Sequence, residues 1–147
     1  MIGPRFVGVR ELAARPNVRL IEAVPHRDVM RYMAHFDVGI LPYVLDAFTA
    51  AVMPVKLKEY LAAGLPVVST PLPDVLRFAQ HHQETVAFAD DGEDFVAALR
   101  AAVASNTPDA VARRIEVARG YDWKNQMETL GGWMEDLMAT PSYDPPR

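Results

Sequence analysis

Short apolar runs alternate along this chain with segments in which apolar residues recur every three or four positions. The short runs are typical of buried strands and the longer spacing is typical of amphipathic helices. Strands are predicted over Val18–Val24, Val38–Tyr43, Val67–Thr70 and Thr85–Ala89. Helices are predicted over Asp28–Phe36, between Pro54 and Gly64, over Asp74–Gln80, from Asp91 to Val103, over Pro108–Arg119, and after Asp122 to Leu137. Arg5–Arg15 is predicted to be weakly helical or irregular, and Gly131-Gly132 predicts a kink or an early end in the last helix.

Strands that alternate with helices predict an α/β fold with a doubly wound parallel sheet. Ligands of such sheets bind at the carboxyl ends of the strands. Tyr43 ends one predicted strand, and the loop after it leads into the helix that follows Pro54. The sequence therefore predicts a crevice at this edge of the sheet.

The beginning of the helix after Pro54 is unusual. Met53 has no side-chain oxygen that could cap the first free amides, and Lys56 and Lys58 add positive charge where the helix dipole is already positive. Both features suit a bound anion, since free amides and a lysine make a phosphate site. Glu59 lies nearly one turn after Lys56, where its carboxylate could accept hydrogen bonds from two sugar hydroxyls. The alternative is an ordinary surface Lys–Glu pair worth about 0.2–0.5 kcal/mol.

Composition narrows the class of protein. The 147 residues suffice for one domain with its own core, and half of them are apolar. The net charge of −4 does not favour nucleic acid or an anionic membrane surface as a partner. There is no cysteine, no apolar run of membrane-spanning length and no signal peptide at the start, so a cytoplasmic protein is expected.

Several motifs resemble, in order and spacing, the C-terminal half of GT-B glycosyltransferases, most closely the large retaining group called family 4. They are Asn17–Leu20, Val24-Pro25, Phe36–Pro42 and Pro54–Thr70, of which the part from Lys56 to Thr70 is the most specific. The resemblance implies a Rossmann-like domain over residues 1–139 that binds a nucleotide-diphospho-sugar donor, UDP- or GDP-linked, followed by a loose tail over 140–147. It also implies transfer to a saccharide or lipid-linked glycan, as in bacterial polysaccharide biosynthesis.

The resemblance also implies roles for individual residues. Glu59 matches the glutamate that holds the ribose hydroxyls, and Lys56 matches a phosphate-binding lysine. Met53 and Val55 match positions whose backbone amides approach the diphosphate, and Tyr43 matches a strand-end position near the nucleotide.

Two departures from the family pattern limit the inference. Ala51 stands where a first glutamate usually touches the donor sugar, and Asp46 in the same loop is the candidate substitute. The acceptor domain and the first strand and helix of this half are also absent, so the chain is expected to be a truncated, inactive fragment. The resemblance implies a last helix that crosses to the missing domain, so Trp123, Trp133 and Met134 could be left as an exposed apolar patch, and self-association is expected.

The expected chemistry needs no metal. Amides and Lys56 would stabilise charge on the departing phosphate, and no Asp-x-Asp pair suited to a metal–diphosphate bridge is present. A location in the cytoplasm, or at the cytoplasmic face of the inner membrane, is expected. The alternative is a non-catalytic α/β module, either receiver-like or oligomerising; a receiver needs an acidic cluster at the strand ends, where this chain has Pro42-Tyr43.

Overall fold

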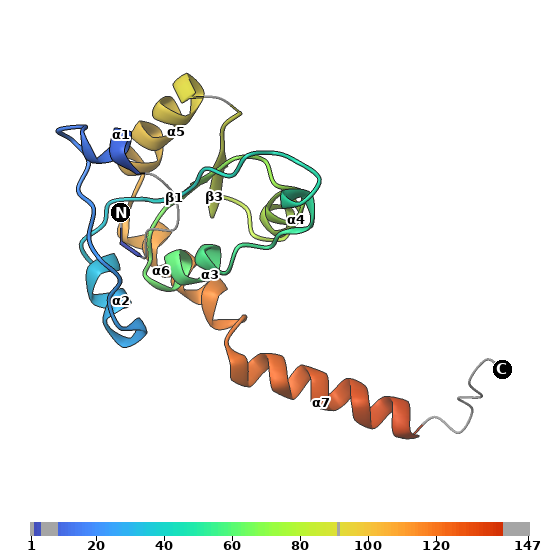
Figure 1. The fold of residues 1–147 in the computed structure, drawn as a ribbon. Coiled ribbons are helices and arrows are strands. Elements are labelled where there is room, and N and C mark those ends of the chain that lie inside the picture. The colour runs from blue at the N-terminus through green and yellow to red at the C-terminus, as the bar shows by residue number, and fades with distance from the viewer. Residues whose placement is uncertain (1, 4–8, 91, 140–147) are drawn as a thin grey trace. The chain divides into compact units, whose positions relative to one another are not determined.

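The computed structural model describes residues 2–3, 9–90 and 92–139, and the chain divides into two compact units, Met1–Phe36 and Asp37–Arg147. Each unit is considered by itself. The tail expected over 140–147 lies outside the described residues. The elements in chain order (Figure 1) are α1 (Arg10–Ala13), α2 (His26–Met33), β1 (Gly39–Leu41), the 3-10 helix η1 (Thr49–Ala51), α3 (Val55–Ala62), β2 (Val67–Ser69), α4 (Pro73–His81), β3 (Val86–Phe88), α5 (Gly92–Ala104), α6 (Pro108–Arg119) and α7 (Trp123–Ala139).

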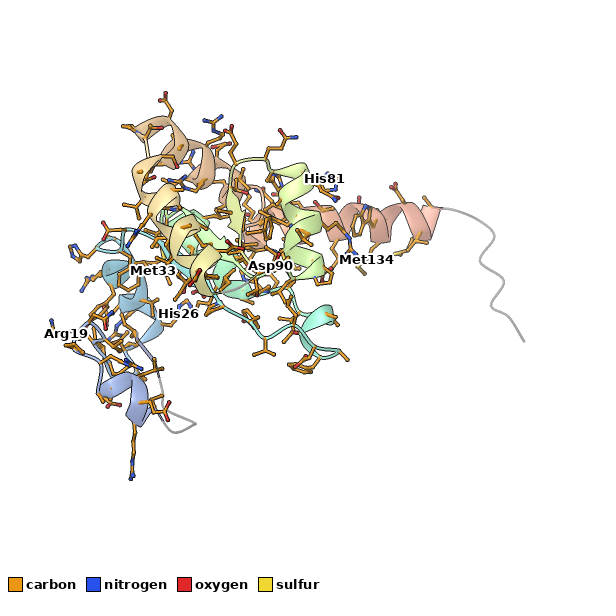
Figure 2. All side chains as sticks on the ribbon, turned by 90° about the horizontal axis from the view of Figure 1, so that it is seen from above. Arg19, His26, Met33, His81, Asp90 and Met134 are labelled. Carbon is orange, nitrogen blue, oxygen red and sulfur yellow. The ribbon has the colours of Figure 1, made fainter. Side chains whose placement is uncertain are left out.

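Over residues 2–3 and 9–36, the first unit contains α1, α2 and one parallel bridge, between Ile2 and Ile21. The regular strand predicted over Val18–Val24 is therefore wrong. Alternation makes a segment suitable for pairing, but a ladder also needs a neighbouring strand, and here pairing stops at one residue pair. Helix α2 begins two residues earlier than predicted and ends at Met33, a buried side chain labelled in Figure 2.

The second unit contains a three-stranded sheet in the order β1-β2-β3, with both pairs parallel. Helix α3 joins β1 to β2, and α4 joins β2 to β3, because parallel neighbours need a crossover connection. This arrangement confirms the predicted α/β class and the Rossmann-like parallel sheet. The strands are shorter than the apolar runs that predicted them, since only three residues of each make ladder pairs.

Helix α3 is held against the sheet by one apolar stripe. Leu57 and Leu61 are fully buried and join a core cluster with Leu41, Val67, Leu72, Val75 and Phe78. Full burial of a leucine side chain stabilises by about 1.5–3 kcal/mol. Tyr60, beside the stripe, packs its ring against Gly39 of β1, where an added Cβ would collide with the ring carbons.

The end of α3 follows the Schellman pattern. Gly64 has a φ of 75°, Leu65 N donates to Tyr60 O at 2.9 Å, and Gly64 N donates to Leu61 O at 2.9 Å. The chain thereby turns directly from α3 into β2, which was the arrangement predicted from Gly64, Pro66 and the valines that follow.

The last helix, α7, begins as predicted and then differs from the prediction. Asn125 N donates to an Asp122 carboxylate oxygen at 2.8 Å, so Asp122 caps the helix. The helix continues through Gly131-Gly132 without ending early. No residue of α7 is buried, and Met134 on this helix is labelled in Figure 2.

An aromatic cluster ties the end of α4 to the segment after α6. His82 Nε2 lies 2.7 Å from the Tyr121 hydroxyl, and the rings of Phe78 and His82 are 4.6 Å apart. Lys58 Nζ lies 4.7 Å from the centre of the Tyr121 ring, within cation–π range. Burial, and next the positive charge of His81, lower the pKa of His82 below its ordinary value.

The left-handed turn at Gly64 generates a stability prediction. We expect Gly64→Ala to lower the free energy of unfolding by about 1–3 kcal/mol, because a Cβ at this φ is strained and would lie 2.7 Å from Val111 Cγ1. Urea unfolding measures the change. Gly131→Ala is the matched control, since a Cβ there meets nothing within 4 Å and favours the helix. Equal effects of Gly64→Ala and Gly131→Ala on the free energy of unfolding would contradict the left-handed turn at Gly64 as the cause.

The lowered pKa of His82 predicts a pH dependence of stability. The folded state holds this proton less tightly than the unfolded state, so the free energy of unfolding should fall as the pH drops below about 6.5 and through the lowered pKa. Urea unfolding between about pH 5 and 8 tests this. His82→Gln keeps an acceptor for Tyr121 without titrating and should flatten the profile, whereas the control His81→Gln should retain most of it. An unchanged profile in His82→Gln would refute the prediction.

Candidate functional site

The entrance of α3 lies directly after the loop that leaves the carboxyl end of β1. Pro54 is the N-cap residue, one position earlier than a first-turn proline, and no side chain caps the first amides. Leu57 N donates to Pro54 O at 3.0 Å, which satisfies one amide of the first turn with a backbone carbonyl. Val55 and Lys56 precede Leu57 in the first turn, and their backbone amides point out of the amino end of the helix.

Lys56 and Glu59 form a hydrogen-bonded ion pair on the side of this first turn. The Lys56 side chain is 49% exposed and the Glu59 side chain 21% exposed, so the lysine is the more accessible of the two to a ligand. An exposed pair of this kind stabilises the helix by only a few tenths of a kcal/mol. A ligand that separates the two groups therefore loses little free energy.

Tyr43 and Met53 flank the entrance and are half-buried, each packed against the core cluster. Tyr43 N donates to Leu41 O at 3.0 Å, which turns the chain immediately after β1. The Tyr60 hydroxyl belongs to the same neighbourhood: burial, then the Glu59 carboxylate, then Tyr43 raise its pKa. Tyr60 was not among the predicted site residues, although its place next to Glu59 on a short helix was a usable signal.

Lys58 does not belong to the entrance. Its ammonium lies over the Tyr121 ring, 4.7 Å from the centre, on the side of α3 that faces the segment after α6. The interpretation of both lysines as anion-binding charge is thus wrong for Lys58. Lys58 is two positions after Lys56, and this offset rotates its side chain by more than half a turn around the helix.

Asp46 is held within its own loop. Its carboxylate accepts from Thr49 N at 2.8 Å and lies 3.1 Å from Thr49 Oγ1, while Asp46 N donates to Thr49 Oγ1 at 2.9 Å. The Thr49 hydroxyl also donates to Val44 O at 2.6 Å. The hydrogen bond from the Thr49 amide is the main reason why the pKa of Asp46 is lowered. These reciprocal bonds hold the loop before η1 together and make Asp46 first a loop-forming residue.

The same loop borders a hollow of about 400 Å³ at the carboxyl edge of the sheet, whose other wall is the turn after β2. Asp46, Thr49 and Ala50 lie on one side, and Pro71 and Pro73 lie on the other. Asp46 thus faces space large enough for a small polar group. The residues that line this hollow include Asp46 but neither Lys56 nor Glu59, so Asp46 borders a hollow of its own beside the helix entrance.

Hydrophobic side chains are exposed around this edge. Val44 is 75% exposed, Phe48 80% and Val55 71%. Val44 and Phe48 belong to the loop after β1, and Val55 is the first residue of α3. The side chain of Val55 therefore lies at the surface, while its amide belongs to the first turn of α3.

In the described residues, no three His, Asp or Glu side chains are grouped so that they could hold a metal ion. None of the helices over the described ranges combines the length and apolar character needed to cross a membrane.

Two comparisons with known proteins bear on the chain. The family described as Glycosyl transferases group 1 matches residues 2–105. A protein of Bacillus subtilis (strain 168), named "Putative teichuronic acid biosynthesis glycosyltransferase TuaH", is 35% identical over 118 residues. That match covers 80% of this chain and 30% of the relative, so the chain spans less than a third of the relative's length. With the parallel sheet and the segment from β1 to β2 inside the matched range, the chain belongs to the group 1 glycosyltransferase family.

Proposed function

We propose that this chain binds the diphosphate and ribose of a nucleotide-sugar donor, UDP- or GDP-linked, at the entrance of α3. The observation that carries the proposal is the absence of a side-chain cap at this entrance together with the Lys56–Glu59 pair beside it. A helix N-terminus with free amides and a half-exposed ammonium is suited to phosphate. The group 1 family and the name of the relative support a sugar-transfer role.

The proposed binding mode gives each residue a task. Lys56 leaves Glu59 and donates to the diphosphate, together with the amides at Met53 and Val55. Glu59, now without its lysine, accepts hydrogen bonds from the two ribose hydroxyls. Tyr43, half-buried after β1, borders the base or ribose, and Asp46 faces the sugar from its hollow.

The chemistry follows from where charge develops. When the bond between the anomeric carbon and the diphosphate breaks, negative charge grows on the departing phosphate oxygen. Fixed amide dipoles and an ammonium stabilise that charge without reorganisation, and this needs no metal. The acceptor, a saccharide or lipid-linked glycan, is proposed to bind to a separate half of the enzyme, and we expect no turnover by the 147 residues tested alone. The cytoplasm is the proposed location.

Titration with nucleotides tests this proposal. We expect UDP or GDP to shift the backbone amide resonances of Val55–Glu59 in a ¹⁵N-labelled chain. Lys56→Ala should weaken UDP binding at least tenfold, about the loss expected for a charge-assisted hydrogen bond, and should affect uridine much less. Glu59→Gln should weaken UDP and uridine alike but should leave the binding of 2′-deoxy-UDP almost unchanged.

A matched control is available for the lysine. Lys124 and Glu128 form an exposed pair on α7, 3.9 Å apart, so Lys124→Ala removes the same charge from the same kind of pair. It should leave nucleotide binding unchanged. If UDP and GDP shift no resonance near Val55, or if Lys124→Ala weakens binding as much as Lys56→Ala does, the proposal fails.

A second proposal concerns α7, and the exposure of its apolar side chains favours it. Trp123 is 81% exposed, Trp133 64% and Met134 55%. Trp123, Met127, Leu130, Met134 and Leu137 follow each other at alternating steps of four and three, the spacing of a coiled-coil seam. We infer that this stripe pairs with its equivalent in a second copy of the chain.

Sedimentation equilibrium tests the pairing of α7. We expect the apparent mass to rise with protein concentration in the wild-type chain, and Met134→Glu to abolish the rise because it places a charge in the seam. Glu128→Gln, off the stripe on the same helix, is the control and should associate as the wild type does. A monomer at every concentration would rule out the pairing and leave the donor-site proposal untouched.

A further inference from the structure

A cavity of about 400 Å³ lies at the amino-terminal edge of the sheet, the edge opposite the entrance of α3. Its apolar wall includes Val67 and Val86, which begin β2 and β3, and Ala102 of α5. Its polar wall comes from the segments before β3 and between α5 and α6, with Thr85, Ser105 and Thr107. The cavity therefore combines an apolar side with a hydroxyl-rich side.

Two arginines of α6 line this cavity, and one of them is a buried cation. Arg114 is only 4% exposed. Its Nε donates to Gly64 O at 3.0 Å, and an Nη2 proton goes to the Asn106 side-chain oxygen. Both acceptors are neutral, and over the described ranges no carboxylate lies within 4.0 Å of its guanidinium.

A buried charge without a counter-charge is unusual, because buried ions in proteins are normally paired. The carbonyl at the end of α3 supplies a partial negative charge from the helix dipole, which compensates part of the cost. The neighbouring charge of Arg113 works in the opposite direction, since it is the second cause, after burial, that lowers the pKa of Arg114. The positive charge of Arg114 is thus only partly compensated by its neighbours, and Arg114 lines an open cavity.

One carboxylate is close to the second arginine. Glu84 lies 3.4 Å from Arg113 Nη1, with both side chains more than half exposed, so this pair is solvent-screened and weak. Two guanidinium groups against one carboxylate leave the lining one positive charge in excess. An anion that entered would meet Arg114 from inside and Arg113 from the rim.

We propose that this cavity is a binding site for a small organic oxyanion, a phosphate monoester or a carboxylate. The oxyanion would lie against Arg113 and Arg114, since a guanidinium fork matches both groups geometrically. The apolar body of the ligand would lie against Val67, Val86 and Ala102. The site is separate from the proposed donor site, at the other edge of the sheet, and does not depend on it.

The competing explanation is that Arg114 serves only to clamp the end of α3 to α6. A pure clamp would show no saturable response to anions and no dependence on the size of the cavity. Binding would show both, and it would also respond to Glu84 in the opposite direction to the arginines. These differences allow one set of variants to separate the two explanations.

The probes are phenyl phosphate and benzoate, each titrated into the full 147-residue ¹⁵N-labelled chain at constant ionic strength. We expect saturable shifts of the Thr85 and Ser105 amides and of the Arg114 Nε–H resonance, with a Kd in about the millimolar range. The tighter of the two probes identifies the class of oxyanion. The amides of Val55–Glu59 should not move, which distinguishes this site from the donor site.

Three variants make the test specific. Ala102→Leu fills the cavity without changing charge and should abolish the shifts. Glu84→Gln removes the competing carboxylate and should tighten binding about two- to fivefold. Arg113→Gln should weaken binding severalfold, whereas Arg119→Gln, which breaks the exposed Arg119–Glu116 pair on the same helix, should have no effect.

The outcomes are decisive in either direction. Absence of saturable shifts in both the wild type and Glu84→Gln would overturn the proposal. Unchanged shifts in Ala102→Leu would also overturn it, because the probe would then bind elsewhere. Arg114→Lys should weaken binding about tenfold, because lysine cannot donate two parallel hydrogen bonds to an oxyanion. If Arg114→Lys does not fold, Ala102→Leu and Glu84→Gln still distinguish binding from a purely structural role.

Discussion

The second unit depends on the burial of one stripe of α3 against the sheet. Leu57 and Leu61 are wholly enclosed, and the left-handed turn at Gly64 returns the chain into β2, whose three residues are all buried. Helix α3 also packs against α6, where Val111 lies beside Gly64 and Arg114 donates to the Gly64 carbonyl. Its two ends are therefore placed by the core, and both proposed binding sites depend on that placement.

The two ends of α3 differ in whether the rest of the chain supplies hydrogen-bond partners for their backbone groups. At the carboxyl end, Leu65 and Gly64 donate back into the helix and Arg114 donates to the Gly64 carbonyl, so the exposed acceptors of that end are largely satisfied. At the amino end no side chain caps the first turn. A helix end without a side-chain cap, beside a half-exposed ammonium, is the physical basis of the donor-site proposal.

Some features that suggest function in sequence turn out to be structural in the first place. Lys58 lies over Tyr121, in the same cluster that contains His82, and contributes to packing between α3 and the segment after α6. Asp46 organises its loop through Thr49 before it can meet any ligand. Arg114 is the opposite case: in the sequence it looks like an ordinary surface charge of a helix, and only its burial in the structure points to a function.

Local physical chemistry was enough to predict much of this protein: the α/β class, the turn at Gly64, the cap at Asp122 and the uncapped entrance after Pro54. Such features depend on backbone preferences and periodicity within a few residues, which the sequence contains directly. The pairing of Val18–Val24, the direction of Lys58, the bonds of Asp46 and the buried charge at Arg114 were decided only by the tertiary structure. Each depends on which distant segment lies alongside, because a ladder, a ring contact or a desolvated cation requires a partner far away in the chain.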